Sequence, residues 1–145
     1  MCNCKLGVNK CPLNGNCLQK SLVYKTEVTS GNQSAVYFGL ASNSFKERYN
    51  NHVSSFRNER HKESTNLSKY IWHLKEAKKE YHMKWSIAAS APAYNTSSKR
   101  CQLCLTEKAF ILYNDHNHPL NKRSELLATC RHRKKHLLSS CPQRC

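Results

Sequence analysis

Two short apolar segments with a turn between them constrain this chain more than any other feature of its sequence. Residues 22–29 and 35–41 are rich in β-branched and aromatic side chains, and Ser30-Gly31-Asn32-Gln33 between them is typical of a turn. The pattern predicts the two strands of a β-hairpin. One tyrosine lies in each predicted strand, Tyr24 in the first and Tyr37 in the second.

Two helices are predicted after the hairpin. Cap residues at 42–44 precede a predicted helix over 45–56, in which Arg48 and His52 share one face because they lie four residues apart. A polar loop over 57–64 leads to a second predicted helix over 66–80. Four apolar residues recur in it at helical spacing and predict its buried face: Leu67, Tyr70, Ile71 and Leu74.

The second half of the chain predicts one strand and two further helices. A third strand is predicted from four residues at alternating positions, which form its buried face: Met83, Trp85, Ile87 and Ala89. A third helix is predicted over 101–113, with Glu107 in an otherwise apolar stretch, and a final basic helix over 124–138.

Length and charge limit the kind of protein. A chain of 145 residues is long enough for one domain with a single core. Its 24 Lys and Arg against 9 Asp and Glu give a formal net charge of +15, which favours a polyanionic partner. No stretch approaches the roughly 20 apolar residues of a membrane span, and no signal peptide is recognisable. We therefore expect an intracellular protein without a membrane partner.

The cysteines predict metal binding. Nine cysteines in a chain without a secretory signal favour metal ligation over disulfides, and the first 17 residues have too few apolar side chains to keep a shape by burial. One candidate zinc quartet is Cys2, Cys4, Cys11 and Cys17; the other is Cys101, Cys104, Cys130 and His132. Ligands could also be exchanged between the two groups, and reduced cysteines that simply pack in a core remain the alternative.

The ordered set of these residues resembles a known family. Val23-Tyr24, Tyr37-Phe38-Gly39, Arg48, His52, Glu107 and Asn121 follow one another as in GIY-YIG nuclease domains. More narrowly, four motifs resemble the endonuclease domain of Penelope-like retroelements: Cys11-Pro12-Leu13-Asn14-Gly15-Asn16-Cys17, Leu67-Ser68-Lys69-Tyr70-Ile71-Trp72, Arg100-Cys101-Gln102-Leu103-Cys104, and Cys130-Arg131-His132-Arg133.

The resemblance implies a fold and a domain plan. The fold is α/β and GIY-YIG-like, with a small, mainly antiparallel three-stranded sheet flanked by helices and with zinc-bound cysteine segments. Residues 1–20 would form a cysteine-rich zinc-binding segment, 21–138 the nuclease domain, and 139–145 a tail. Leu22 and Phe38 depart from the family, which has glycine and isoleucine there, so the first strand is expected to sit differently.

The resemblance also implies residue roles. Glu107 would hold Mg²⁺ or Mn²⁺, and Arg48 would bind the scissile phosphate. Tyr24 would act as general base, Tyr37 would position water or phosphate, and His52 would orient Tyr24 or relay its proton. Asn121 would fix the substrate backbone or the fold, and His61 is a further candidate. A basic set would contact DNA phosphates: Lys122, Arg123, Arg131, Arg133, Lys134 and Lys135.

Each of these residues also has an ordinary structural role to be weighed. The tyrosines could be packing residues of a sheet, and Glu107 could pair with a lysine or arginine. Arg48 and His52 could belong to a solvated helix face, and Asn121 could cap the last helix.

The residues and the resemblance together predict a metal-dependent DNA endonuclease. The resemblance further implies that it works in the nucleus and nicks a target site for the reverse transcriptase of the same retroelement polyprotein. The alternatives are a zinc-stabilised nucleic-acid-binding module without catalysis and a secreted disulfide protein.

Overall fold

The computed structural model describes residues 2–4, 10–92, 97, 101–113 and 120–121. Its centre is an antiparallel sheet in the order β2-β1-β3, built from β1 (Lys20–Ser30), β2 (Gln33–Ser44) and β3 (His82–Ser90). Four helical segments follow from the loops: α1 (Phe45–Arg57), the 3₁₀ turn η2 (Glu59–His61), α2 (Asn66–Glu76) and α3 (Gln102–Leu112). The expected α/β class with a small three-stranded antiparallel sheet is confirmed.

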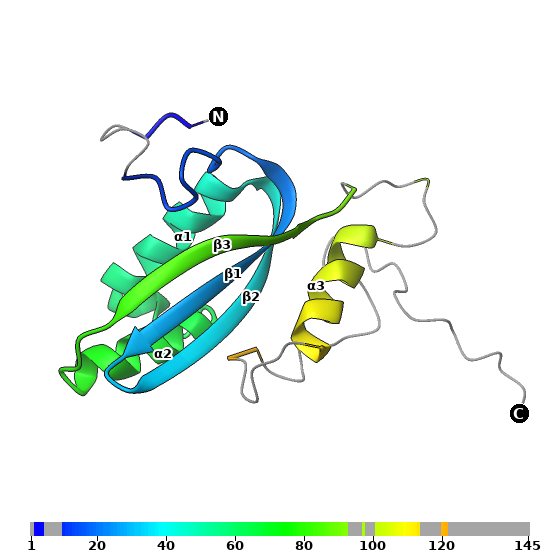
Figure 1. The fold of residues 1–145 in the computed structure, drawn as a ribbon. Coiled ribbons are helices and arrows are strands. Elements are labelled where there is room, and N and C mark those ends of the chain that lie inside the picture. The colour runs from blue at the N-terminus through cyan, green and yellow to red at the C-terminus, as the bar shows by residue number, and fades with distance from the viewer. Residues whose placement is uncertain (1, 5–9, 93–96, 98–100, 114–119, 122–145) are drawn as a thin grey trace, which may run out of the picture.

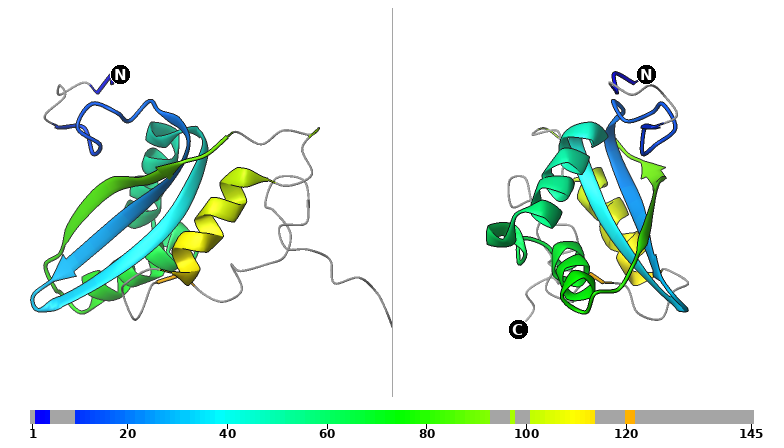
Figure 2. Two further views of the ribbon diagram at one scale, coloured as in Figure 1. Left: turned by 45° about the vertical axis from the view of Figure 1, so that its right-hand side comes forward. Right: turned by 90° about the vertical axis from the view of Figure 1, so that its left-hand side faces the viewer.

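The sheet is covered on both faces, with α1 and α2 on one side and α3 on the other (Figure 1, Figure 2). Successive strand residues point to opposite faces, so β1 supplies both cores. Leu22, Tyr24 and Val28 pack with the α1 and α2 side, whereas Val23 packs with α3. Burial on both faces explains why Leu22, Val23 and Tyr24 are buried in succession rather than in strict alternation.

The hairpin turn sets the register of the sheet. Gly31 has φ 57° at the first central position of a two-residue loop, a conformation that glycine adopts without strain. Counting back from this turn pairs Tyr24 with Gly39 and Thr26 with Tyr37. Both tyrosines therefore point to the α1 side of the sheet.

Helix α1 begins on carbonyl groups of the cysteine segment. Phe45 N donates to Gln19 O at 2.9 Å and Lys46 N to Cys17 O at 2.7 Å, and Glu47 N donates to Ser44 Oγ. These bonds satisfy N–H groups that the first turn of a helix leaves without an intrahelical acceptor. The N-terminal segment thus fixes where α1 starts.

Helix α2 ends at Glu76, four residues before the predicted end. Lys78 adopts φ 55°, its N–H bonds Lys75 O, and Lys79 N bonds Leu74 O. This is the pattern of a Schellman cap, in which a left-handed residue closes the helix. The residue in that position is lysine, so the sequence lacks the usual glycine signal.

Strand β3 departs from the predicted alternation at its end. Met83, Trp85 and Ile87 pack against the α1 side as expected. A bulge lies between the pairs Val23–Ala89 and Tyr24–Ile87, so Ala89 pairs with a residue of the α3 face. The expectation that Ala89 shares one buried face with the other three is therefore wrong.

Among the described residues, no helix has the length and apolar character needed to cross a membrane.

Candidate functional site

A buried tyrosine–histidine pair lies between β1 and α1. The Tyr24 hydroxyl is 2.6 Å from His52 Nε2, and both side chains are almost fully buried. The ring of Tyr37 lies edge-on to His52, with 5.9 Å between ring centroids. Burial, reinforced by the charge of Arg48, lowers the pKa of His52 to about 3. His52 is therefore a neutral imidazole at physiological pH.

Gly39 makes this arrangement possible. A Cβ atom built on Gly39 would lie 2.2 Å from the Tyr24 hydroxyl oxygen and 2.4 Å from Cζ of the ring. Real Cβ atoms do not approach other atoms so closely, and the phenol therefore lies directly over the bare glycine backbone of its cross-strand partner. Any side chain at position 39 would displace the hydroxyl from His52.

Arg48, in the first turns of α1, interacts with the Tyr24 side chain of this pair. Burial disfavours the charged guanidinium, but the charge and hydrogen bond of Tyr24, together with Tyr37 and Glu107, raise the pKa of Arg48. Its Nε atom is buried and has no hydrogen-bond partner within the described residues. A buried guanidinium N–H of this kind is suited to an oxygen of a bound anion.

Glu107 belongs to the buried stripe of α3. Its side chain is fully buried, as are its neighbours Leu103 and Cys104 on the same stripe. The charge of Glu107 contributes to the raised pKa of Arg48, so the carboxylate lies within electrostatic range of the guanidinium. Tyr24, Tyr37, Arg48 and His52 are brought together from three elements, and Glu107 from a fourth lies within electrostatic range of Arg48.

Two hollows meet at Arg48. One, of about 320 Å³, lies between α1 and the start of α2, and its lining includes Arg48, His52 and His61. The other, of about 310 Å³, lies between the end of β2 and α1. Arg48 and Asn51 line both hollows. His61, a lesser candidate in the sequence, therefore faces the same space as Arg48 and His52.

Asn121 holds the free edge of β2. Its Oδ1 accepts from Phe38 N at 2.9 Å and its Nδ2 donates to Phe38 O at 2.7 Å, while Leu120 N bonds Val36 O. The side-chain amide thus pairs with a strand residue as a neighbouring strand would. Three roles were considered for Asn121: fixing the substrate backbone, fixing the fold around the site and capping the last helix. This contact favours fixing the fold.

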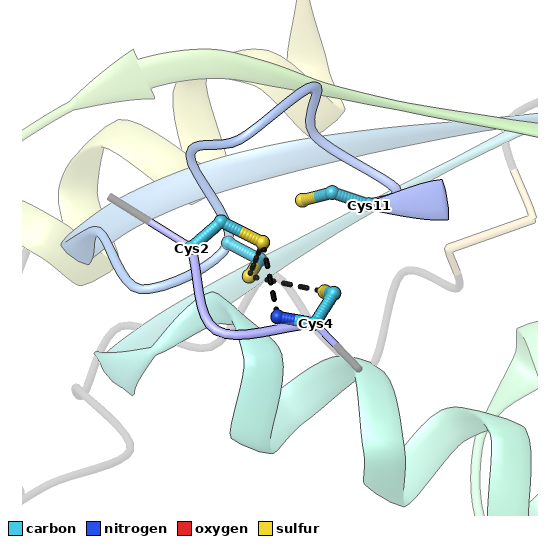
Figure 3. A group of neighbouring side chains, drawn as sticks. Cys2, Cys4 and Cys11 are labelled. Atoms are coloured by element: carbon cyan, nitrogen blue, oxygen red, sulfur yellow. Dashed lines mark hydrogen bonds between the residues drawn. The ribbon is translucent and has the colours of Figure 1, made fainter. Parts of the chain in front are cut away.

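The four N-terminal cysteines form a compact sulfur cluster (Figure 3). Their sulfur atoms all lie within 4.8 Å of one another, with 3.4 Å between Cys17 and Cys2 and 3.7 Å between Cys4 and Cys17. Ligands about 2.3 Å from a tetrahedral zinc ion would have sulfur atoms roughly 3.8 Å apart, whereas a disulfide bond is about 2.05 Å long. The cluster can therefore hold a metal ion such as zinc.

The protonation chemistry of this cluster is also suited to metal binding. Burial opposes ionisation of Cys11, but the backbone N–H groups of Gly15 and Leu13 outweigh it and lower its pKa to about 6. Burial and the neighbouring thiols raise the pKa of Cys17 to about 12. One thiolate is thus ready to bind a cation, and a bound cation would favour ionisation of the others.

Other predicted residues stand apart or lie outside the described residues. Cys101 and Cys104 pack with Val23 on the α3 face, in a different cluster from the N-terminal quartet. Cys130 and His132, and the basic set Lys122, Arg123, Arg131, Arg133, Lys134 and Lys135, lie outside the part that the structure describes. The second zinc quartet and the basic DNA-binding set stay predictions, as does the final helix over 124–138.

Comparison of this chain with protein-family models, with curated proteins and with solved structures finds no match.

Sequence reasoning gave Gly39 only as part of a motif and missed its physical role. This role could have been predicted, because counting residues back from the two-residue turn at Gly31 and Asn32 pairs Gly39 with Tyr24 across the hairpin. It also missed the hollow beside Asn43 and Glu47, which no local pattern marks.

Proposed function

We propose that this protein is a divalent-metal-dependent endonuclease that hydrolyses phosphodiester bonds in DNA. The observation that carries the proposal is a convergent set of groups around Arg48: its partly buried guanidinium interacts with the hydrogen-bonded tyrosine–histidine pair and is influenced by the buried carboxylate of Glu107. Phosphodiester hydrolysis needs a group that accepts a proton from water and groups that stabilise the charge of the phosphoryl oxygens. The convergent set contains candidates for both.

Arg48 is the proposed phosphate ligand. Its Nε has no hydrogen-bond partner among the described residues, and its planar fork can donate to two phosphate oxygens at once. It also lines both hollows, so a strand of nucleic acid that crosses from one to the other would pass over it.

Tyr24 is the proposed base for the attacking water. A phenol with an ordinary pKa near 10 is a weak base at neutral pH, so its ionised form must be stabilised. The guanidinium of Arg48 interacts with Tyr24, and a positive charge beside a phenol favours the phenolate. His52, whose pKa is about 3, orients the hydroxyl rather than carrying the proton, and Tyr37 positions water or phosphate.

Glu107 is the proposed ligand of the divalent ion. A buried carboxylate favours positive charge beside it, and a hard oxygen donor is what Mg²⁺ or Mn²⁺ prefers. A single carboxylate suits an ion that keeps water and phosphate oxygens in its other positions. When bound, the ion would neutralise charge on the phosphate and polarise the leaving oxygen.

The four N-terminal cysteines are the proposed ligands of a structural zinc ion. Four thiolates around zinc leave no open position for water, so this site would stabilise the segment and not catalyse. Cys17 O caps α1, the helix that carries Arg48, so the zinc segment would also fix the position of the phosphate ligand.

The particular protein we propose is a GIY-YIG endonuclease of the kind found in Penelope-like retroelements. The arrangement of two tyrosines on neighbouring strands, Arg48 and His52 on α1 and Glu107 on α3 supports this assignment. Such an enzyme would work in the nucleus, with DNA as substrate and the reverse transcriptase of the same polyprotein as partner.

The test is nicking of supercoiled plasmid by purified protein with Mg²⁺. We expect Glu107→Gln to lower the nicking rate at least about 100-fold, the scale of losing one group that stabilises developing charge. DNA binding should persist. Glu59→Gln, the same change at an exposed acid of η2, is the matched control and should keep the wild-type rate.

A competing function is a zinc-stabilised nucleic-acid-binding module without catalysis, which the sulfur cluster and the net charge of +15 favour. It predicts that the wild-type protein binds plasmid but does not nick it. That result, obtained with folded and metal-loaded protein, would reject the endonuclease.

A further inference from the structure

The hollow between the end of β2 and α1 contains polar side chains that the proposed chemistry does not use. It has a volume of about 310 Å³, within the range of small-molecule sites. Its lining is polar or small apart from Leu40: Leu40, Ala41, Ser42, Asn43, Ser44, Glu47, Arg48 and Asn51. We name it the β2–α1 hollow.

Three of these side chains have hydrogen-bonding capacity to spare. Asn43, Glu47 and Asn51 are exposed, and within the described residues their side chains make no hydrogen bond or ion pair. They come from the end of β2 and two successive turns of α1, so they are presented from different sides of one hollow.

The chemistry of the hollow disfavours a second phosphate. The N–H groups of Phe45, Lys46 and Glu47 in the first turn of α1 already bond Gln19 O, Cys17 O and Ser44 Oγ, so the helix start offers no donors for an anion there. The carboxylate of Glu47 would repel a phosphate. Amide and carboxylate groups without a net positive charge are instead suited to the edge of a nucleobase.

We infer that the β2–α1 hollow recognises the base of the nucleotide next to the phosphate held by Arg48. Arg48 lines the hollow, so a nucleotide whose phosphate contacts the guanidinium would bring its base toward Asn43, Glu47 and Asn51. This inference rests on the proposed function for the phosphate position, and it adds the determinants of sequence preference.

The side chains predict which bases are preferred. A carboxylate only accepts hydrogen bonds, so Glu47 favours a base whose major-groove edge carries an amino group, cytosine or adenine, and rejects the O4 carbonyl of thymine. Asn43 and Asn51 can each donate and accept, as in the paired contacts that asparagine makes with adenine. The site is therefore expected to disfavour thymine.

The test measures binding, so that it does not depend on cleavage. A pool of short DNA duplexes with random sequence is bound to the full chain in Ca²⁺, and the bound fraction is sequenced. The wild-type protein should enrich cytosine or adenine over thymine at one position by about tenfold, the fold-change that corresponds to the lower part of the 1–3 kcal/mol typical of a good base contact.

Glu47→Gln should reduce this enrichment to about twofold or less, because an amide can also donate to the thymine carbonyl. Asn51→Ala should weaken preference at the same position. Glu59→Gln is the matched control and should keep the wild-type preference, and thermal melting verifies that each variant is folded.

The outcomes are distinct. An unchanged preference in folded Glu47→Gln, or no preference at any position in the wild-type protein, overturns the inference. A preference that depends on Glu47 in a protein that never nicks DNA supports the inference and rejects the endonuclease. Failure of the wild-type protein to bind DNA overturns both.

Discussion

Cys17 and Leu22 lie five residues apart and are both completely buried, yet their surroundings hold them by different means. Leu22 belongs to a strand that is bonded on both sides and packed between helices. Cys17 belongs to a segment of turns. Its backbone is held by a few hydrogen bonds, such as those from Asn14 N to Cys11 O and from Asn16 N to Leu13 O. Its sulfur lies in the cluster with Cys2 and Cys4.

The difference separates two sources of order. The sheet is stabilised by apolar burial and by hydrogen bonds between its strands, and neither depends on a bound ion. The cysteine segment adds only Cys11, Leu13 and Cys17 to the buried core, so its order depends largely on what binds the four sulfur atoms. The two regions meet where Cys17 O and Gln19 O cap α1.

The largest expected effect is loss of metal from the cysteine segment. Cys17→Ser should remove one equivalent of zinc per chain, because four thiolates are needed and structural zinc in small domains contributes about 10–16 kcal/mol of binding free energy. Amide hydrogen exchange should accelerate at Asn14, Asn16, Phe45 and Lys46, while circular dichroism still reports the sheet and α2.

Elemental analysis and hydrogen exchange measure this outcome. Cys141→Ser, the same substitution outside the quartet, is the control and should keep both the zinc content and the exchange rates. Unchanged zinc content in Cys17→Ser would show that these sulfur atoms do not bind the ion.

The next largest effect concerns the stability of the sheet and should leave metal binding unchanged. Gly39→Ala should lower the free energy of unfolding by about 3 kcal/mol, the upper range for overpacking a core, because its Cβ would clash with Tyr24. Zinc content should stay constant. Urea unfolding measures the change.

A second substitution isolates the clash. In a Tyr24→Ala background, Gly39→Ala should cost much less, since the phenol is gone. Gly31→Ala is the control: nothing lies within 4 Å of its Cβ, so its cost of about 1 kcal/mol reflects the left-handed backbone alone and should not depend on Tyr24. Equal costs of Gly39→Ala in both backgrounds would contradict the geometry.

The smallest effect near neutral pH is a pH dependence of the sheet region through His52, which grows as the pH falls. Its pKa is about 3 in the folded chain and about 6.5 when unfolded, so the unfolded state binds more protons between these values. Stability contributed by neutral His52 is complete above about pH 6.5 and falls as pH decreases toward 3, by up to about 1.4 kcal/mol per pH unit.

The measurement is the free energy of unfolding at several pH values for the wild-type protein and for His52→Asn. The difference in slope between the two isolates His52 from the cysteines, which titrate in both proteins. Parallel curves below pH 6 would mean that His52 is protonated in the folded chain without penalty.

Much of the fold followed from local patterns. The hairpin, the helix that begins at Phe45 and the core-facing Leu67, Ile71 and Leu74 agree with the structure, because periodicity and cap residues act over a few positions. The end of α2 was missed because Lys78 occupies a position usually taken by glycine. The bulge that turns Ala89 to the α3 face has no sequence signal of its own.

The candidate site was also predictable only in part from the sequence. The residue types and their order pointed to Tyr24, Tyr37, Arg48, His52 and Glu107, but they could not say that Glu107, from a helix on the opposite face of the sheet, influences Arg48. Nor could they choose among groupings of the cysteines.

By itself the sequence determined the elements that local physics controls: a hairpin with a tyrosine in each strand, helices with caps, and a cysteine segment too poor in apolar residues to fold by burial. Only the tertiary structure decided the contacts between distant residues, among them Tyr24 with His52, Asn121 on the edge of β2 and the grouping of Cys2, Cys4, Cys11 and Cys17. Such contacts depend on how the faces of the sheet are packed, and packing is a property of the whole chain rather than of any short stretch of it.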